Sequence, residues 1–345
     1  MSEAEHFQDW DLSHWQYLHG KPSGTADFKS LPQDFVVTEK LGFELTGEGE
    51  NLFLLIEKEG LNTQQVCEYL AKFFNKRLRD IGYAGLKDKQ SVSRQWFSVQ
   101  MNLTQQVDLS GLDTEQIRLI EHTRHQRKLK VGALQANHFA IRLKNVSDIE
   151  ELKQRLERVR ATQVPNYFGL QRFGFKGNNL NWANRMASGE QIRDKKIKGF
   201  ALSASRSYLF NQVVSERLSH KVFMTPLVGE AFLLTGSNSY FCQQVDDTIY
   251  QRLQDKDIQL SGPLFGAGES ITSGPVQVLE SGVLAQQQNW CDLLVANGLK
   301  QERRALALVP KNMTWHLDGG EANIEFELPA GAFATSVLRE CVNFN

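Results

Sequence analysis

The sequence predicts a mixed α and β (α+β) fold in which one domain is interrupted by another. Strand-like segments lie near both ends of the chain, whereas amphipathic helical patterns dominate its middle. The chain has 345 residues, of which 41% are apolar and 23% are charged. This composition is that of a globular protein with a substantial core, and it excludes disordered, collagen-like and coiled-coil classes. The length lies between one large domain and two or three average ones.

Strands are predicted wherever short stretches alternate between apolar and polar residues or are rich in β-branched and aromatic residues. These stretches are Phe35–Glu39, Leu52–Ile56, Gln95–Met101, Lys128–Leu134, Phe139–Leu143 and Glu321–Leu328.

Helices are predicted where apolar residues recur at helical spacing behind an N-cap. Asn62 with Gln65, and Ser147 with Glu150, form capping boxes that begin two such helices, the second reaching about Arg160. Val164-Pro165-Asn166 then breaks the pattern. Later helices are expected over Ala204–Leu218, over Leu284–Asn297, and after the turn Pro329-Ala-Gly331 through Cys341.

Several classes of protein are disfavoured by what the sequence lacks. No apolar run approaches the roughly 20 residues that span a bilayer. Met1–Trp10 lacks the basic-then-apolar order of a signal peptide. The four cysteines and eight histidines are scattered without CxxC or HExxH spacing. We therefore expect a cytoplasmic protein with reduced thiols and no structural metal.

Charge is unevenly distributed, although 39 Lys and Arg nearly balance 40 Asp and Glu. Two windows, His122–Ser147 and Pro165–Ser188, contain no acidic residue. Their basic residues are Arg124, Arg127, Lys128, Lys130, Arg142 and Lys144 in the first, and Arg172, Lys176 and Arg185 in the second. Such windows indicate a surface that could follow a polyanion. The alternative is two solvated faces that happen to be basic.

The densest polar cluster is the stretch Gly82–Trp96, in which Asp88 lies between Lys87 and Lys89 and is followed by Arg94. Cations around a carboxylate favour its ionised form, which suits a nucleophile. The alternative is an aspartate that stabilises a polar turn.

A second cluster, Val164–Gly174, interleaves aromatic rings with Arg172. Aromatic and arginine side chains together can stack bases and neutralise phosphates. A hydrophobic turn that packs one domain on another is an equal alternative. The glycines here are no phosphate loop, because neither GxxxxGK[ST] nor GxGxxG occurs.

Smaller signals are Asn137-His-Phe139 before a predicted strand and Phe333 in the turn that follows Leu328. An isolated phenylalanine is normally a core residue. His125 and His138 could act as bases, but a lone histidine beside a basic strand is more often structural. No GxSxG element supports a serine nucleophile.

Five motifs together resemble the TruD family of tRNA pseudouridine synthases and follow that family's order. They are Gly85-Leu-Lys-Asp-Lys-Gln90, Asn137-His-Phe139, Pro165-Asn-Tyr-Phe-Gly-Leu-Gln-Arg-Phe173, Arg206-Ser-Tyr-Leu-Phe-Asn211 and Leu328-Pro-Ala-Gly-Ala-Phe333. The resemblance extends from Lys29 and Asp34–Glu39 to Arg339. It implies isomerisation of uridine to pseudouridine at position 13 of tRNA.

The resemblance also implies a domain division. Residues 1–163 and 306–345 would form a split pseudouridine synthase catalytic domain around a bent antiparallel sheet, and 164–305 an inserted α/β TRUD domain.

Roles for single residues follow from the same resemblance. Asp88 matches the catalytic aspartate, and Phe35, Asn137 and Phe333 match positions that hold the target uridine. Phe139 fills the place where related synthases carry a tyrosine.

The chemistry sets further expectations. Isomerisation neither oxidises nor hydrolyses, so we expect no cofactor and no metal. A buried carboxylate needs a cation to stay charged, and Lys29 is the predicted partner of Asp88, with Lys87 and Arg94 as rivals.

The expected partner is tRNA, whose position 13 requires base flipping. Its backbone would follow Arg124, Arg127, Lys128, Lys130 and Arg172. Another RNA substrate, or a non-catalytic RNA-binding or RNA-folding role, remains an alternative. The absence of a heptad repeat favours a monomer.

Overall fold

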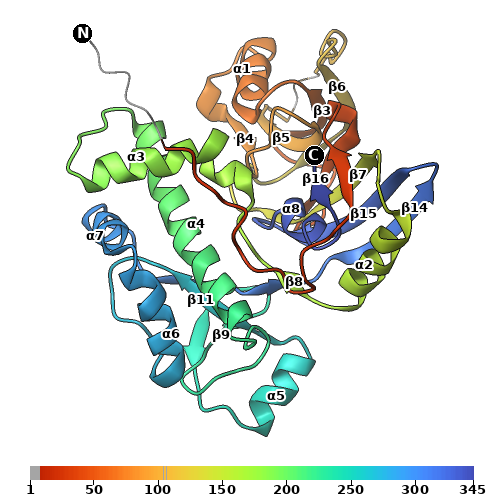
Figure 1. The fold of residues 1–345 in the computed structure, drawn as a ribbon. Helices are drawn as coiled ribbons and strands as arrows, with labels where there is room; N and C mark the ends of the chain where they lie inside the picture. Colours follow the sequence, from red (N-terminus) through yellow and green to blue (C-terminus); the bar gives the residue numbers. More distant parts are fainter. Residues whose placement is uncertain (1–7, 104, 106) are drawn as a thin grey trace, which may run out of the picture. The chain divides into compact units, whose positions relative to one another are not determined.

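The computed structural model describes residues 8–103, 105 and 107–345, and the chain divides into two compact units (Figure 1). The sheet unit comprises Pro22–Ala161, Pro310–Gly331 and Cys341–Asn345. The helical unit comprises Thr162–Val309, Ala332–Glu340 and the described part of Met1–Lys21. The mixed α and β class predicted from the sequence is confirmed. The predicted domain boundaries after residues 163 and 305 fall near two of these divisions, and the domain assignment itself stays a prediction.

In the described part of the chain, the sheet unit is built on ten strands. The main path of the sheet runs, in order, through β14 (Lys311–Asp318), β15 (Glu321–Pro329), β7 (Leu134–Lys144), β2 (Phe35–Leu41), β5 (Val92–Gln100), β3 (Asn51–Glu59) and β6 (Ile117–His125). Three short strands join its margins, namely β1 (Thr25–Phe28), β4 (Ile81–Tyr83) and β16 (Asn343–Phe344).

The prediction of an antiparallel sheet is correct for most pairs and wrong for two. The pairs β2–β5 and β1–β16 are parallel, so the sheet is mixed. The reason for the first exception is that β3, α1 (Thr63–Phe73) and β4 lie between β2 and β5 in sequence, and a crossover of that length permits parallel pairing. The family resemblance predicted the general architecture but not which strands pair or in which direction.

Helix α1 covers one face of this sheet. Its N-cap is Asn62, whose side chain accepts from the Gln65 amide while the Gln65 side chain accepts from the Asn62 amide, as the capping box predicts. Its buried face carries Val66 and Leu70, which lie in one core cluster with Leu54 of β3. This packing places the start of α1 against the segment that precedes β5.

Two local predictions in the sheet unit are wrong. Helix α2 (Ile149–Ala161) is capped by Asp148, which accepts from the Glu151 amide, rather than by Ser147, whose hydroxyl accepts from the Thr25 amide. The predicted strand Lys128–Leu134 is a loop up to β7, in which Gly132 has a φ of +90°. Strands β6 and β14 were not predicted, because most of their exposed residues are polar or charged and few apolar residues mark the pattern.

The helical unit holds α3 (Asn178–Ala187), α4 (Lys195–Ser219), α5 (Asp247–Gln254), α6 (Gly274–Ala285), α7 (Gln288–Ala296) and α8 (Ala334–Leu338). Among its described residues, β10 (Tyr240–Cys242), β9 (Ala231–Leu234), β11 (Ile258–Leu264) and β12 (Glu302–Ala305) form a four-stranded sheet, and β8 (Val164–Pro165) pairs with β13 (Ala307–Leu308). No described helix is both long enough and apolar enough to cross a membrane.

Three helix predictions in this unit need correction. Helix α4 begins at Lys195, ahead of the predicted Ala204, because the Asp194 side chain caps it. The predicted helix Leu284–Asn297 is two helices, since Gln287 has non-helical backbone angles. The last helix ends at Leu338 rather than continuing through Cys341.

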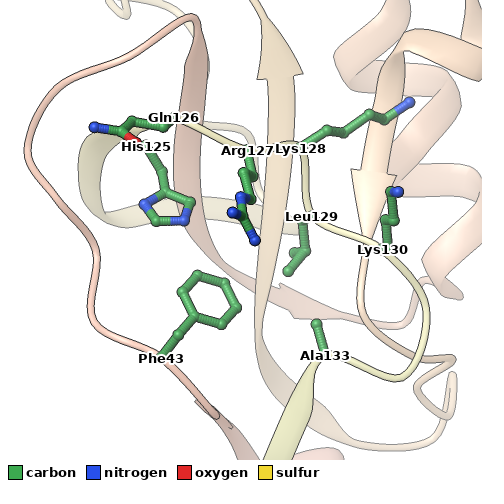
Figure 2. A pocket seen from close by; sticks show the side chains of 8 residues that line it. All are labelled: Phe43, His125, Gln126, Arg127, Lys128, Leu129, Lys130 and Ala133. Carbon is green, nitrogen blue, oxygen red and sulfur yellow. The ribbon is translucent and has the colours of Figure 1, made fainter.

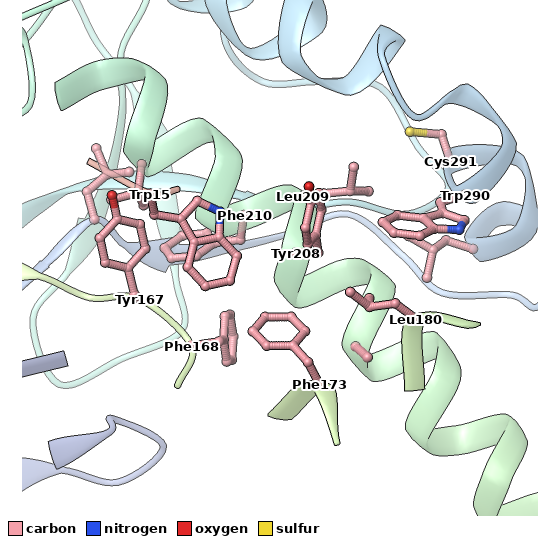
Figure 3. Packing of buried hydrophobic residues seen from close by; sticks show 14 of the residues in the cluster. Trp15, Tyr167, Phe168, Phe173, Leu180, Tyr208, Leu209, Phe210, Trp290 and Cys291 are labelled. Carbon is pink, nitrogen blue, oxygen red and sulfur yellow. The ribbon is translucent and has the colours of Figure 1, made fainter. Parts of the chain in front are cut away.

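Aromatic residues dominate the core of the helical unit, as Figure 3 shows. Tyr167, Phe168 and Phe173 of the second cluster are buried within this core, so these rings do not offer exposed base-stacking faces. That the segment packs one domain on another stays a prediction. Trp15 stacks on Tyr167 at 5.7 Å between ring centroids. The N-terminal stretch thus contributes to this core from Trp10 onward, through Trp10, Leu12 and Trp15. Residues 1–7, which include most of the stretch searched for a signal peptide, lie outside the described residues.

Candidate active site

A buried polar network shapes the segment that carries Asp88, between β4 and β5. The Thr63 hydroxyl accepts from the Lys87 amide at 2.9 Å and donates to Gln95 Oε1 at 3.0 Å. Gln95 Nε2 in turn donates to the Gly85 carbonyl at 2.6 Å. Thr63 and Gln95 are buried. Hydrogen bonds in such surroundings hold a backbone firmly, so the residues on either side of Leu86 are fixed by side chains from α1 and β5.

Lys58 of β3 fixes the main chain of Asp88 itself. Its side chain has no exposed surface, and Nζ donates to the Leu61 carbonyl at 2.6 Å and to the Asp88 carbonyl at 3.0 Å. The Ser91 hydroxyl also donates to the Asp88 carbonyl, at 3.2 Å. Burial lowers the pKa of Lys58 to about 8, against the opposing attraction of the Asp88 and Glu39 carboxylates.

The Asp88 carboxylate remains partly open to solvent. Lys29 Nζ lies 3.3 Å from Asp88 Oδ2, and the Gln90 amide donates to Oδ1 at 3.3 Å. The Asp88 side chain is 26% exposed. Main chain and carboxylate are thus held differently: the carbonyl is fixed by buried donors, while the carboxylate has one cation and an open side.

The predicted rivals of Lys29 have other partners. Lys87 Nζ lies 2.6 Å from Glu39 Oε1, and Arg94 Nε lies 2.8 Å from Glu57 Oε2. Glu39 is buried, and its other oxygen accepts from the Trp96 amide at 2.9 Å. Burial raises the pKa of Glu39, and the ammonium of Lys87 opposes that rise.

Buried aromatic rings lie beside the Lys29–Asp88 pair. Lys29 Nζ is 4.0 Å from the centroid of the Phe35 ring, a cation–π distance. The Phe35 and Phe139 rings are 5.9 Å apart. In the β2–β7 register, Val37 lies opposite Phe139 and Glu39 opposite Asn137. Because side chains alternate along strands, Phe35, Glu39, Asn137 and Phe139 share one face of the sheet.

Asn137 carries an orphan polar atom on this face. The residue is 8% exposed, and among the described residues its Oδ1 has no hydrogen-bond partner. An unsatisfied buried amide oxygen costs about 1–3 kcal/mol. Such an atom is suited to a donor on a bound molecule.

Two other predicted site residues, Phe333 and Arg172, lie in the helical unit. Phe333 belongs to the helical unit, where its ring lies 5.8 Å from that of Phe168. Arg172, in the same unit, donates to the Ser203 hydroxyl at 2.9 Å, and burial lowers its pKa. Their assignment to substrate stays a prediction.

The basic residues near His125 also differ from one another. Arg124 donates to the Gly49 and Gln105 carbonyls, both at 3.1 Å, and Lys128 donates to the Arg79 carbonyl. Arg127 and Lys130 are exposed. The first two side chains therefore tie loops together, whereas the last two face solvent. His138 lies 3.4 Å from Glu325 Oε2 on an exposed surface.

Sequence reasoning missed Lys58, Thr63, Gln95 and Glu39. Two of them left a signal. Lys58 continues the buried register of Leu52, Leu54 and Ile56, and Glu39 continues that of Phe35 and Val37. A charge in the buried register of a strand needs a specific partner, which marks a site worth testing. Within the described residues, no group of three or more His, Cys, Asp or Glu side chains is placed to hold a metal ion.

Comparison with known proteins identifies the class to which this fold and site belong. A family model described as tRNA pseudouridine synthase D (TruD) matches residues 12–190 and 184–341. The chain belongs to this family of pseudouridine synthases, which are isomerases, and the resemblance read from the motifs is confirmed.

Individual relatives agree. A protein of Pseudoalteromonas atlantica named tRNA pseudouridine synthase D is 45% identical over 338 residues, which cover 96% of this chain and 97% of that protein. One of Shewanella oneidensis with the same name is 41% identical over 334 residues, covering 96% and 90%. A crystal structure of a Methanosarcina mazei protein described as TruD matches with a TM-score of 0.71 at 20% identity over 95% of this chain and 96% of that chain, which supports the fold.

Proposed function

We propose that the protein isomerises uridine to pseudouridine at position 13 of tRNA, with Asp88 as the catalytic carboxylate. The observation that carries this proposal is the way Asp88 is held. Its main chain is fixed by Lys58 and Ser91, and its carboxylate stays partly exposed beside the ammonium of Lys29. A preorganised carboxylate with an open side can approach a reacting sugar or base.

The reaction breaks the bond between ribose C1′ and uracil N1, turns the base, and joins C5 to C1′. The proton on C5 is lost and N1 gains one, so atoms and electrons balance without an oxidant. An ionised Asp88 can begin this by attacking C1′, by attacking C6, or by removing the ribose 2′ proton to give a glycal. A primary deuterium isotope effect at the 2′ carbon distinguishes the glycal route from the two attacks.

Recognition of the uridine follows from the face beside Asp88. The orphan Oδ1 of Asn137 can accept the N3–H of uracil, whereas cytosine has no hydrogen at N3. Extruding a nucleotide costs a few kcal/mol. Base stacking on aromatic side chains recovers about 1–3 kcal/mol per base. Phe35 and Phe139 are 7% and 6% exposed, so they would supply part of it at this face only after a shift that opens a ring face to the base. Phe333 is assigned the same task by the family resemblance.

The remaining parts of the proposal are the RNA path and the domain roles. Arg127 and Lys130 are exposed cations in an acid-free window, which suits contacts with phosphates. Arg124, Lys128 and Arg172 have protein partners, so we expect them to affect tRNA binding less. Residues 164–305 would be the inserted domain and the flanking segments the catalytic domain, as the resemblance implies.

The test is carbodiimide-adduct primer extension across position 13 of an unmodified tRNA that carries uridine there. Purified wild-type protein is expected to give a stop at that position without added cofactor. Asp88→Asn keeps the shape but removes the charge, and it should lose activity by at least about 10³-fold, since carboxylate catalysis contributes on this scale. Asp80→Asn, eight positions earlier in a capping role, is the matched control and should keep its activity.

Other results would lead elsewhere. Near-normal turnover by Asp88→Asn would remove the catalytic assignment. Tight tRNA binding with no stop from the wild type would point first to another RNA substrate. A non-catalytic role in binding or folding RNA would follow only if no RNA were modified and Asp88→Asn had no effect in cells.

A further inference from the structure

A pocket in the sheet unit is not used by the site around Asp88. It has a volume of about 740 Å³ and is lined by Phe43, His125, Gln126, Arg127, Lys128, Leu129, Lys130 and Ala133 (Figure 2). Pockets that bind small molecules measure roughly 300–1,000 Å³. The pocket is therefore large enough for a nucleotide.

One wall of the pocket offers an aromatic surface. The Phe43 ring stacks on the His125 ring at 4.9 Å between centroids and 25° between planes, and Phe43 is 36% exposed. Phe53 supports the pair from below, with its ring 5.3 Å from that of His125. Leu129 and Ala133 continue the apolar lining. A planar base can stack on such a surface whatever its sequence.

His125 is suited to a neutral, hydrogen-bonding role in this wall. Burial and the charge of Arg127 lower the pKa of His125, which favours the neutral imidazole. The Thr46 amide lies 3.4 Å and the Thr46 hydroxyl 3.3 Å from Nδ1, so Nδ1 has partners within the protein and Nε2 is left for a bound group. The ring can thus offer Nε2 to a hydrogen-bonding group of a base or a sugar.

The rim is basic. Three of the eight lining residues are Arg or Lys and none is acidic; a nearby carboxylate, Glu48, accepts from the Gln126 side chain at 3.2 Å. Figure 2 shows the Arg127 side chain extending toward the space between Phe43 and Leu129. An apolar aromatic wall beside exposed cations is complementary to a nucleotide, which combines a planar base with an anionic phosphate.

The pocket wall is attached to the segment that carries Asp88. The Gly132 amide donates to the Ala84 carbonyl at 2.9 Å, and the Leu129 amide donates to the Ser98 hydroxyl at 3.0 Å. Gly82 allows this close approach, because a Cβ there would lie 2.4 Å from the Leu129 carbonyl oxygen. A nucleotide in the pocket would therefore rest against the same structural segment that positions Asp88.

We propose that this pocket binds one extruded nucleotide of the substrate RNA, distinct from the nucleotide that reacts at Asp88, with its base on Phe43 and its phosphate at Arg127. The proposal rests on the proposed function, since it takes the RNA to be the substrate of this enzyme. It adds a second point of recognition that would hold the RNA while the target uridine is turned.

Binding of an unmodified tRNA transcript that carries uridine 13 tests the proposal. Phe43→Ala should raise the dissociation constant about tenfold, in line with the loss of one stacked base. Phe43→Tyr keeps the ring and should bind as wild type does. Tyr250→Ala is the control for loss of an exposed ring, because Tyr250 lies on α5 among acidic residues and is 48% exposed. Ultraviolet cross-linking should join the tRNA to the peptide that contains Phe43.

The phosphate contact has its own test. Arg127→Glu should raise the dissociation constant and flatten its logarithmic salt dependence by about one. Lys153→Glu, at an exposed lysine of α2, makes the same kind of charge reversal away from the pocket and should do less. If Arg127→Glu weakens binding while Phe43→Ala does not, the surface contacts phosphates only and the nucleotide pocket is refuted.

The outcomes also separate this proposal from the proposed function. Pseudouridine formation by the wild type, together with unchanged tRNA binding by Phe43→Ala, would overturn the pocket alone. Weaker binding by Phe43→Ala and a Phe43 cross-link, together with no pseudouridine at position 13, would overturn the proposed function and retain the pocket.

Discussion

Two buried cations, Arg217 of the helical unit and Lys58 of the sheet unit, are held in different ways. In the helical unit, Arg217 and Glu230 have no exposed side-chain surface, and two guanidinium nitrogens donate to the two carboxylate oxygens at 3.2 and 2.8 Å. Arg217 Nη2 also donates to the Thr225 carbonyl, at 3.1 Å. In the sheet unit, the buried Lys58 has no carboxylate within salt-bridge distance in the described chain, and donates to two main-chain carbonyls.

This difference distinguishes a charge pair that stabilises the fold from charges that could act on a substrate. A closed arginine–glutamate pair satisfies both charges internally and has little to offer a ligand. Lys58 instead holds the main-chain carbonyl of Asp88, and Lys29 pairs with the carboxylate of the same residue, which keeps an open side. Charge that is incompletely compensated inside a protein is expensive to keep, and it is commonly found where a substrate completes the arrangement. The following predictions test whether each set of charges has the role assigned to it.

The largest effect is expected at the closed pair. Arg217→Met leaves the Glu230 carboxylate buried without its cation, and should lower the free energy of unfolding by about 3–5 kcal/mol. Burial already raises the pKa of Glu230, and Arg217 opposes that rise. Chemical denaturation followed by circular dichroism measures the loss. The double variant Arg217→Met with Glu230→Leu should recover most of it, whereas no recovery would show that the pair itself is not what stabilises this region.

Lys58→Met should act on turnover rather than on tRNA affinity. Without the ammonium, the Asp88 carbonyl loses one of its two side-chain donors and the carboxylate loses a nearby positive charge. We expect kcat to fall about 10- to 100-fold, the scale of a catalytic group misplaced by about an ångström, while KM changes by less than about threefold. Steady-state kinetics on tRNA give both constants.

The control for this prediction is Lys153→Met, the same substitution at an exposed lysine of α2. A loss carried by KM instead of kcat would make Lys58 part of RNA binding. A kcat within twofold of the wild type would make the buried lysine a structural residue only.

Lys29→Met should have a smaller effect. The Lys29–Asp88 ion pair is partly exposed, and ion pairs of this kind contribute about 1 kcal/mol or less. We expect a single-turnover rate lower by up to about fivefold at saturating protein, with Lys29→Arg retaining most of the rate. Lys40→Met removes a more exposed lysine that pairs with Glu327, and serves as the control. Equal losses in Lys29→Met and Lys29→Arg would argue against a charge effect.

Some of these residues could be predicted from the sequence, whereas the partners of others could not. The order of the motifs predicted Asp88, Lys29 and the aromatic positions as site residues. Periodicity predicted α1 and the strands that carry Phe35 and Phe139. Local patterns could not give the partners of Lys58 and Glu39, because these contacts join segments far apart in the chain. The loop 128–133 resembled a strand in composition, yet turn geometry at Gly132 and its bond to Ala84 determine its path. Tertiary contacts override local preference at such positions.

The last prediction concerns the dependence of stability on pH. In the folded protein the pKa of Lys58 is about 8, below the ordinary value of 10.5 expected in the unfolded chain. Between these values the unfolded chain holds a proton on Lys58 that the folded protein has released. The free energy of unfolding therefore rises with pH in this window, by on the order of 1 kcal/mol per pH unit from this group.

Chemical denaturation of the wild type and of Lys58→Met is measured at several pH values from 7.5 to about 10. The contribution of Lys58 is the change with pH in the difference between their free energies of unfolding. The difference should shift in favour of the wild type as pH increases, because the variant has no group to deprotonate there. Lys153→Met should follow the wild type across the whole range. If the free energies of unfolding of wild type and Lys58→Met change with pH in parallel, Lys58 titrates as an ordinary lysine. Its buried charge would then not distinguish the surroundings of Asp88 from the closed pair of Arg217 and Glu230.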